Sequence, residues 1–96
     1  MALSRLTVTL GAAATQVTAT ETYVSFVRIE NEAGNALVKY GESDISANDY
    51  AGSVPADTAT ASNGVSLGPC SANLISLHEL YLIGTAAQRV HLTVVV

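Results

Sequence analysis

In the segment RVHLTVVV, Arg89–Val96, every second side chain is valine or leucine. Successive side chains of a β-strand point to opposite faces, so this spacing predicts a strand. One face carries Val90, Leu92, Val94 and Val96. The other, more polar face carries His91, Thr93 and Val95. The strand therefore belongs to a sheet that buries one face in a core and leaves the second face for water or a neighbouring molecule.

The three valines at the end of this segment raise the question of what covers them. An apolar strand edge that stays unpaired favours aggregation, so we expect each valine to be covered. The core of the same domain is expected to cover Val94 and Val96, whereas Val95 faces a neighbouring subunit. The predicted oligomer-interface residues are His91, Thr93 and Val95 on the polar face, together with Val96.

The same period of two runs through much of the chain. RLTVTL, TQVTAT and YVSFVRIE all alternate, and their Thr, Val, Tyr and Ile residues suit a half-buried sheet. ENEAGN predicts a hairpin between YVSFVRIE and ALVKYG, and TAAQ predicts another between HELYLIG and RVHLTVVV. Tyr23 and Tyr81 lie in apolar strands and are expected in the core. The sequence predicts an all-β single domain over residues 1–96, a jelly-roll-like β-sandwich of about seven or eight short strands, with no helix.

The alternation weakens between Glu42 and Ser66, where Ser, Ala, Asn, Asp and Gly predominate. A connection of this length in a compact domain usually has a function. Its acidic residues lack the spacing of an EF-hand, so we expect a solvated loop rather than a calcium site. The predicted contact residues, for a shell or a ligand, are Tyr40, Asp44, Asp49 and Tyr50.

Charged residues make up only 12% of the 96 residues, about half of the roughly 25% usual in soluble domains. A weakly charged surface does little to repel a partner, which favours assembly.

The net charge is −4, and the four Lys and Arg residues are scattered along the chain, whereas nucleic-acid binding requires clustered cations. No apolar run reaches the ~20 residues that span a bilayer, so we expect neither nucleic acid nor membrane as a partner. Cys70 is single, which fits synthesis in the reducing cytoplasm of a host cell.

Few side chains carry reactive chemistry, so we expect no enzyme activity. A zinc site needs three or four converging ligands, and the chain has only His78, His91 and Cys70 beside its acids. We therefore expect no metal and no cofactor. No nucleophile elbow, phosphate-binding loop or dinucleotide fingerprint occurs. A small hydrolase that uses His78, His91 or Glu79 is the least favoured alternative.

Two stretches of the chain resemble small β-sandwich virion proteins of tailed bacteriophages. VKYGESDISANDYAG resembles a strand that enters a "GxSDVS"-like turn, and LISLHELYLIGTAAQRVHLTVVV resembles a closing pair of the "LxxLYxIGTAxxxVxV" type. The first stretch matches at Gly41, Ser43, Asp44 and Ser46, with Ile45 as a near match. The second matches at Leu77, Leu80, Tyr81, Ile83, Gly84, Thr85, Ala86 and Val90, with Leu92 in place of the last valine. The opening MALSRLTVTLGAAATQVTA also resembles the start of such proteins, whereas YAGSVPADTATASNG is longer and more polar than the glycine turn expected there.

The resemblance implies a capsid decoration, or cement, protein. Such proteins typically sit as trimers on the outer shell at local three-fold or quasi-three-fold positions, where they bridge capsomers and resist internal pressure. The expected partners are further copies of this chain and the major capsid protein of the same virus, and the expected location is the capsid surface of the virion. The alternative is a receptor- or carbohydrate-binding module of a phage head or tail fibre.

Overall fold

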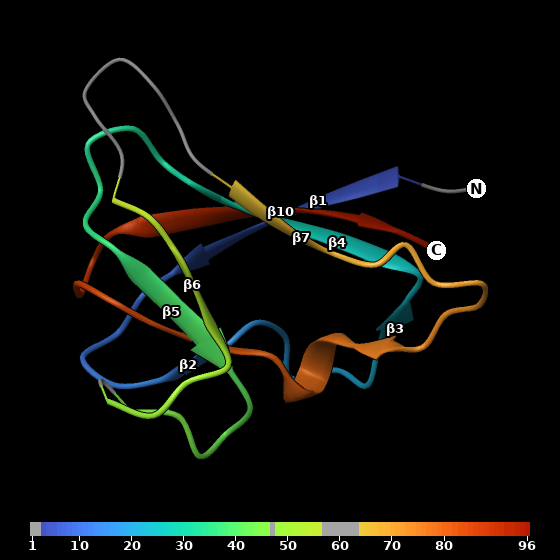
Figure 1. Cartoon of the computed structure of the whole chain (residues 1–96), viewed down its shortest axis with the longest axis horizontal. Coiled ribbons are helices and arrows are strands. Elements are labelled where there is room, and N and C mark those ends of the chain that lie inside the picture. The colour runs from blue at the N-terminus through green and yellow to red at the C-terminus, as the bar shows by residue number, and fades with distance from the viewer. Residues whose placement is uncertain (1–2, 47, 57–63) are drawn as a thin grey trace.

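A computed structural model of the chain describes residues 3–46, 48–56 and 64–96 as two packed β-sheets (Figure 1). Sheet A contains, in order across the sheet, β1 (Leu3–Thr9), β10 (Arg89–Val95), β4 (Phe26–Asn31) and β7 (Gly64–Leu67). Sheet B contains β2 (Thr15–Gln16), β9 (Tyr81–Ile83), β5 (Val38–Gly41) and β6 (Gly52–Val54). β3 (Tyr23–Val24) pairs with β8 (Ile75–Ser76), and a short 3-10 helix, η1 (Leu77–Glu79), follows β8. Residues 57–63 of the predicted long loop lie outside the described residues.

The strands pair in a nested order. β1 pairs with β10, β2 with β9, β3 with β8, β4 with β7 and β5 with β6, always antiparallel. The chain therefore forms one long hairpin whose arms pass repeatedly between the two sheets, which is the connectivity of a jelly roll. The prediction of an all-β, jelly-roll-like sandwich is confirmed. The described residues form ten strands rather than seven or eight, because β3 and β8 form an additional pair outside sheets A and B.

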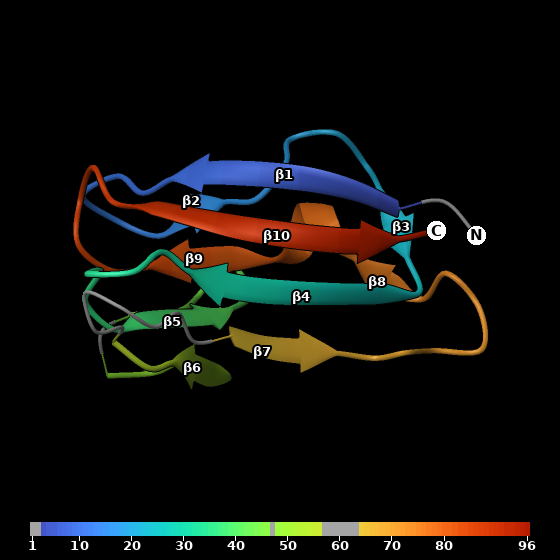
Figure 2. The same ribbon diagram turned by 90° about the horizontal axis from the view of Figure 1, so that it is seen from above.

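Both predicted hairpins are wrong, because each connection carries the chain from one sheet to the other. β4 lies in sheet A and β5 in sheet B, and the same is true of β10 and β9 (Figure 2). The connections do turn where turn chemistry was predicted, with Gly34 at φ +87° and Ala87 at φ 72°. A turn signal does not specify whether the next strand pairs with the previous one. Here both sheets bury their inner faces by packing on each other, and the chain crosses between them.

The core lies between the two sheets. Sheet A contributes Val27, Ile29, Val90 and Leu92, each at most 1% exposed. Sheet B contributes Val38, Val54 and Leu82, which are fully buried. The predicted inward face of the last strand is confirmed for Val90, Leu92 and Val94, whereas Val96 lies beyond the end of β10 and is 50% exposed. Full burial of each such side chain stabilises the fold by about 1.5–3 kcal/mol.

Two local predictions are wrong. His78 and Glu79 belong to η1 and not to a strand, because the N–H of Leu80 turns back to bond the oxygen of Leu77 at 3.1 Å. Tyr23 was expected in the core but is 46% exposed. The cause is an interruption at Ser25, which donates its N–H (2.8 Å) and its hydroxyl (3.1 Å) to the oxygen of Val95. The alternation shifts there, so the residues on both sides of the interruption, Val24 and Val27, point inward.

Candidate functional site

The outward-facing side chains of sheet A form rows across β1, β10 and β4, the strands that lie side by side in Figure 2. Directly opposed residues on neighbouring strands point to the same face, so the register fixes the members of each row. The apolar row is Leu3, Val95 and Phe26. The arginine row is Arg5, Thr93 and Arg28, and the histidine row is Thr7, His91 and Glu30. The predicted interface residues Val95, Thr93 and His91 therefore occupy the centre of the three rows, and Val96 lies just beyond the apolar row.

All three arginines of the chain project from this outer face, although they are far apart in the sequence. Arg28 Nη2 lies 3.7 Å from Glu30 Oε1. Arg89 Nη2 lies 3.0 Å from Glu32 Oε1. Arg5 forms no ion pair with any residue that the structure describes. The face consequently carries an unbalanced positive charge, whereas the chain as a whole has a net charge of −4.

His91 belongs to a hydrogen-bond network that joins β1, β10 and the β4–β5 connection. Its Nδ1 lies 3.2 Å from Thr7 Oγ1, and its Nε2 lies 3.0 Å from Glu32 Oε2. Hydrogen bonds from Arg89 and then from His91 hold the pKa of Glu32 below its ordinary value. A hydroxyl, an imidazole and a carboxylate in this order also form acid–base relays. Here the same carboxylate is also held by Arg89, so the main effect of the network is to fix the β4–β5 connection to sheet A.

The arginine and histidine rows surround a broad, open hollow of about 810 Å³ over β10. Arg5 and Thr7 of β1 line one side, and Glu30 of β4 lines the other, with His91 and Thr93 between them. Small-molecule sites are typically enclosed and mostly apolar. A shallow polar hollow beside an apolar row is better suited to contact with a protein surface, where arginine and aromatic side chains contribute most.

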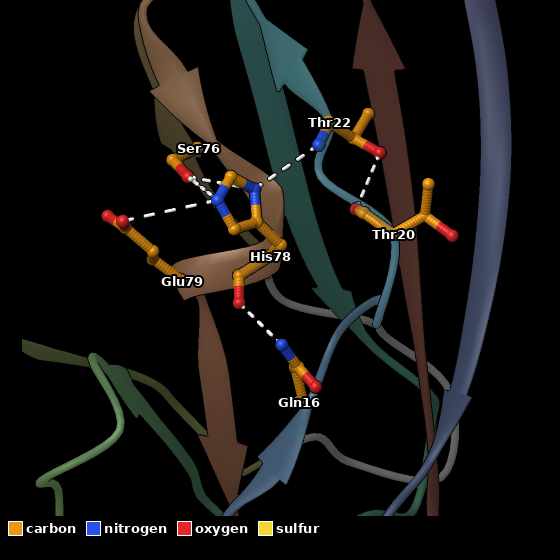
Figure 3. Close-up of polar contacts among 6 residues, drawn as sticks. All are labelled: Gln16, Thr20, Thr22, Ser76, His78 and Glu79. Atoms are coloured by element: carbon orange, nitrogen blue, oxygen red, sulfur yellow. Dashed lines mark hydrogen bonds and ion pairs between the residues drawn. The ribbon is translucent and has the colours of Figure 1, made fainter.

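The second histidine, His78, is fixed by neighbours around its ring (Figure 3). The N–H of Thr22 donates to Nδ1 at 3.2 Å, which places the proton of the neutral ring on Nε2. Ser76 Oγ lies 3.1 Å from Nδ1, and Glu79 Oε1 lies 4.0 Å from Nε2. The main-chain oxygen of His78 accepts a hydrogen bond from Gln16 Nε2 at 2.7 Å. These contacts satisfy the ring and the main-chain oxygen of His78 within the fold.

The predicted contact residues Tyr40, Asp44, Asp49 and Tyr50 lie on or near the β5–β6 connection, which belongs to sheet B and not to the three rows. Tyr40 is half-buried against the core with its ring over Gly52, so it does not form an exposed pair with Tyr50. Tyr50 is 43% exposed, and Lys39 Nζ lies 4.6 Å from its ring centroid. Asp44 and Asp49 are exposed, and the main chains of Ser46 and Asp49 bond each other across the turn.

Sequence reasoning missed the part that Arg5, Arg28, Leu3 and Phe26 play in this surface. The alternation of RLTVTL does place Arg5 outward. Its proximity to Thr93 and Arg28 depends on the order β1–β10–β4, which joins the two ends of the chain to a strand from its middle. The strand order, and not the local pattern, gathers the arginines that look scattered along the sequence.

Comparison of the chain with models of protein families, with curated proteins and with solved structures finds no match. Within residues 3–46, 48–56 and 64–96, no three His, Cys, Asp or Glu side chains gather into a group that could hold a metal ion. The same residues contain no helix of the length and apolar character needed to cross a membrane.

Proposed function

We propose that this chain is a structural virion protein, a capsid decoration protein that assembles as a homotrimer and binds the major capsid protein on the outer shell. The observation that carries the proposal is the outer face of sheet A. It combines an apolar row with exposed arginine on a sheet whose other face is firmly packed, which is the chemistry of a protein interface. The proposed interface residues are His91, Thr93, Val95 and Val96.

The fold also supports this function. The jelly roll is a fold that occurs in viral capsid proteins and in lectins. Nucleic acid is no part of the proposal, because Arg28 and Arg89 are both paired with glutamates and their charge is already balanced. The proposed location is the capsid surface of the virion, after synthesis in the host cytoplasm.

The test is binding of the purified chain to capsid shells of the parent virus that lack it. We expect the chain to sediment with the shells to a saturating, stoichiometric level and to raise the temperature at which the shells break. Shells that take up no chain at any concentration would contradict the proposal.

The alternative function, a receptor- or carbohydrate-binding module of a head or tail fibre, draws support from Tyr50. Tyr50 is 43% exposed on the connection that also carries the exposed residues Asp44 and Asp49, and a tyrosine with an apolar ring and a polar tip suits a binding surface. A glycan array with the native chain tests it, with Tyr50→Ala as the control for specific binding. Binding that is lost in this variant would favour the alternative.

A further inference from the structure

An exposed aromatic side chain, Tyr23, lies at the end of the molecule where β3 pairs with β8. Tyr23 is 46% exposed, and its ring stands edge-on to that of His78 with the centroids 5.4 Å apart. The carboxylate of Glu21 is the main cause of a raised pKa of the Tyr23 hydroxyl, and Glu79 adds to it. Glu21 precedes Tyr23 by two residues, and Glu79 lies beside His78, whose ring contacts Tyr23. We call Tyr23, Glu21 and Glu79 the tyrosine patch.

The carboxylates of this patch form no ion pair with an arginine or lysine that the structure describes. Glu21 forms no ion pair with any described residue, and the nearest basic group to Glu79 is the ring of His78, with the two atoms 4.0 Å apart. Arg5, on the outer face of sheet A, is complementary, because it is an arginine without a carboxylate partner in the described part of the chain. Leu3 beside it is 66% exposed. One surface thus offers an aromatic ring with acids, and the other offers exposed apolar side chains with an arginine.

The two surfaces lie at the same end of the molecule but face different ways. Ser25, which follows β3, bonds the oxygen of Val95 at 2.8 Å, so β3 lies next to the end of β10. Figure 1 shows β3 below sheet A at the end where the two termini lie, whereas the rows project from the outer face of that sheet. Because pairing with β8 fixes β3, a chain cannot fold its tyrosine patch onto its own rows. A second copy can reach them.

We propose that the tyrosine patch of one copy docks on the apolar and arginine rows of the next copy. The Tyr23 ring packs on Leu3, Val95 and Phe26, while Arg5 pairs with Glu21 or Glu79. Tyrosine and arginine are the residues that most often dominate the binding energy of protein interfaces. Two different surfaces meeting head to tail form a heterologous contact, which closes into a ring when the rotation permits. The inference rests on the proposed homotrimer and names the contact that builds it.

The experiment is a charge exchange, read by light scattering behind size exclusion over a range of concentrations. We expect Arg5→Glu and Glu21→Arg each to raise the dissociation constant of the oligomer at least about tenfold, because each places like charges in contact. The double variant Arg5→Glu/Glu21→Arg restores the pair in reverse and is expected to recover the oligomer. Asn48→Arg, at an exposed position of the β5–β6 connection outside both surfaces, serves as the control for an added positive charge and leaves assembly unchanged. Circular dichroism and the melting temperature verify that every variant is folded.

Recovery in the double variant supports the inference, since a merely structural role of either residue does not produce it. Full assembly of both single variants overturns the inference and leaves the proposed function standing, because a trimer that still binds shells must use another contact. A native chain that is monomeric at every concentration also overturns it. In that case, sedimentation of the chain with capsid shells tests the decoration function independently of its oligomeric state.

Tyr23→Ser and Tyr23→Phe provide an independent arm. The serine variant removes the ring and is expected to dissociate, whereas the phenylalanine variant keeps the ring and is expected to assemble. Equal behaviour of the two variants contradicts the role of the ring.

Discussion

The side-chain amide of Asn31 donates a hydrogen bond to the main-chain oxygen of Pro55 at 3.2 Å. The same amide donates to the oxygen of Ala36 at 2.8 Å. Asn31 ends β4 in sheet A, whereas Ala36 and Pro55 belong to the connections before β5 and after β6 of sheet B. One fully buried side chain therefore ties together the two segments that pass between the sheets at this end.

Asn31→Ala is expected to lower the free energy of unfolding by about 1–3 kcal/mol, because it removes the two hydrogen bonds that a fully buried amide donates. Urea denaturation followed by circular dichroism measures the change. The matched control is Asn35→Ala, which removes an exposed bond of 2.7 Å to the oxygen of Arg89 and is expected to cost less. Equal losses in the two variants would show that burial of the amide contributes nothing.

Glu32 makes stability depend on pH in the acid range. Its pKa in the folded chain is lowered, first by the Arg89 hydrogen bond and then by that of His91. Its contribution is therefore fully present above the unfolded value, near 4.5, and is lost as the pH falls through the lower folded value. Glu32→Gln is expected to melt at a lower temperature than the native chain at neutral pH and to approach it in acid.

Thermal melting between neutral and strongly acidic pH measures this convergence. Glu42→Gln, which changes an exposed glutamate of the β5–β6 connection, is the control. A constant difference between the Glu32→Gln variant and the native chain across the whole range would mean that the ion pair contributes nothing to the pH dependence.

Gly68 and Gly34 both have a positive φ, but their surroundings differ. A Cβ on Gly34 meets nothing within 4 Å, whereas one on Gly68 lies 2.6 Å from the main-chain oxygen of Ser25. Gly34→Ala is expected to cost about 1–2 kcal/mol from backbone strain alone. Gly68→Ala is expected to cost about 1–3 kcal/mol more, because hydrogen bonds to Val95 hold Ser25 in place. Denaturant unfolding compares the two, and equal costs would show that the β3–β4 junction yields to the methyl group.

The alternation in the sequence was enough to predict the all-β sandwich and the inward face of β10, because a period of two depends only on neighbouring residues. It was not enough to predict which strands pair. Glu32 and Asn35 lie in a segment with clear turn chemistry, yet the chain crosses there to the opposite sheet. The alternation also predicted that Arg5 points outward. Its position beside Thr93 and Arg28 depends on the pairing of segments that are distant in the sequence. Local patterns therefore predict which side chains of a strand point inward or outward. The strand order determines which outward side chains become neighbours on the surface.

Leu92 and Val95 lie on opposite faces of β10 and separate folding from assembly. Leu92 is 1% exposed in the core, so Leu92→Ala is expected to cost about 2–5 kcal/mol of unfolding free energy.

Val95 is half-buried in the apolar row. Val95→Asp is expected to leave the fold intact and to prevent assembly, because a carboxylate at this position loses its hydration when a neighbouring copy packs on it. Light scattering gives the mass and circular dichroism the fold of each variant. A folded monomer after Val95→Asp assigns Val95 to the interface, and an oligomer of unchanged mass removes it.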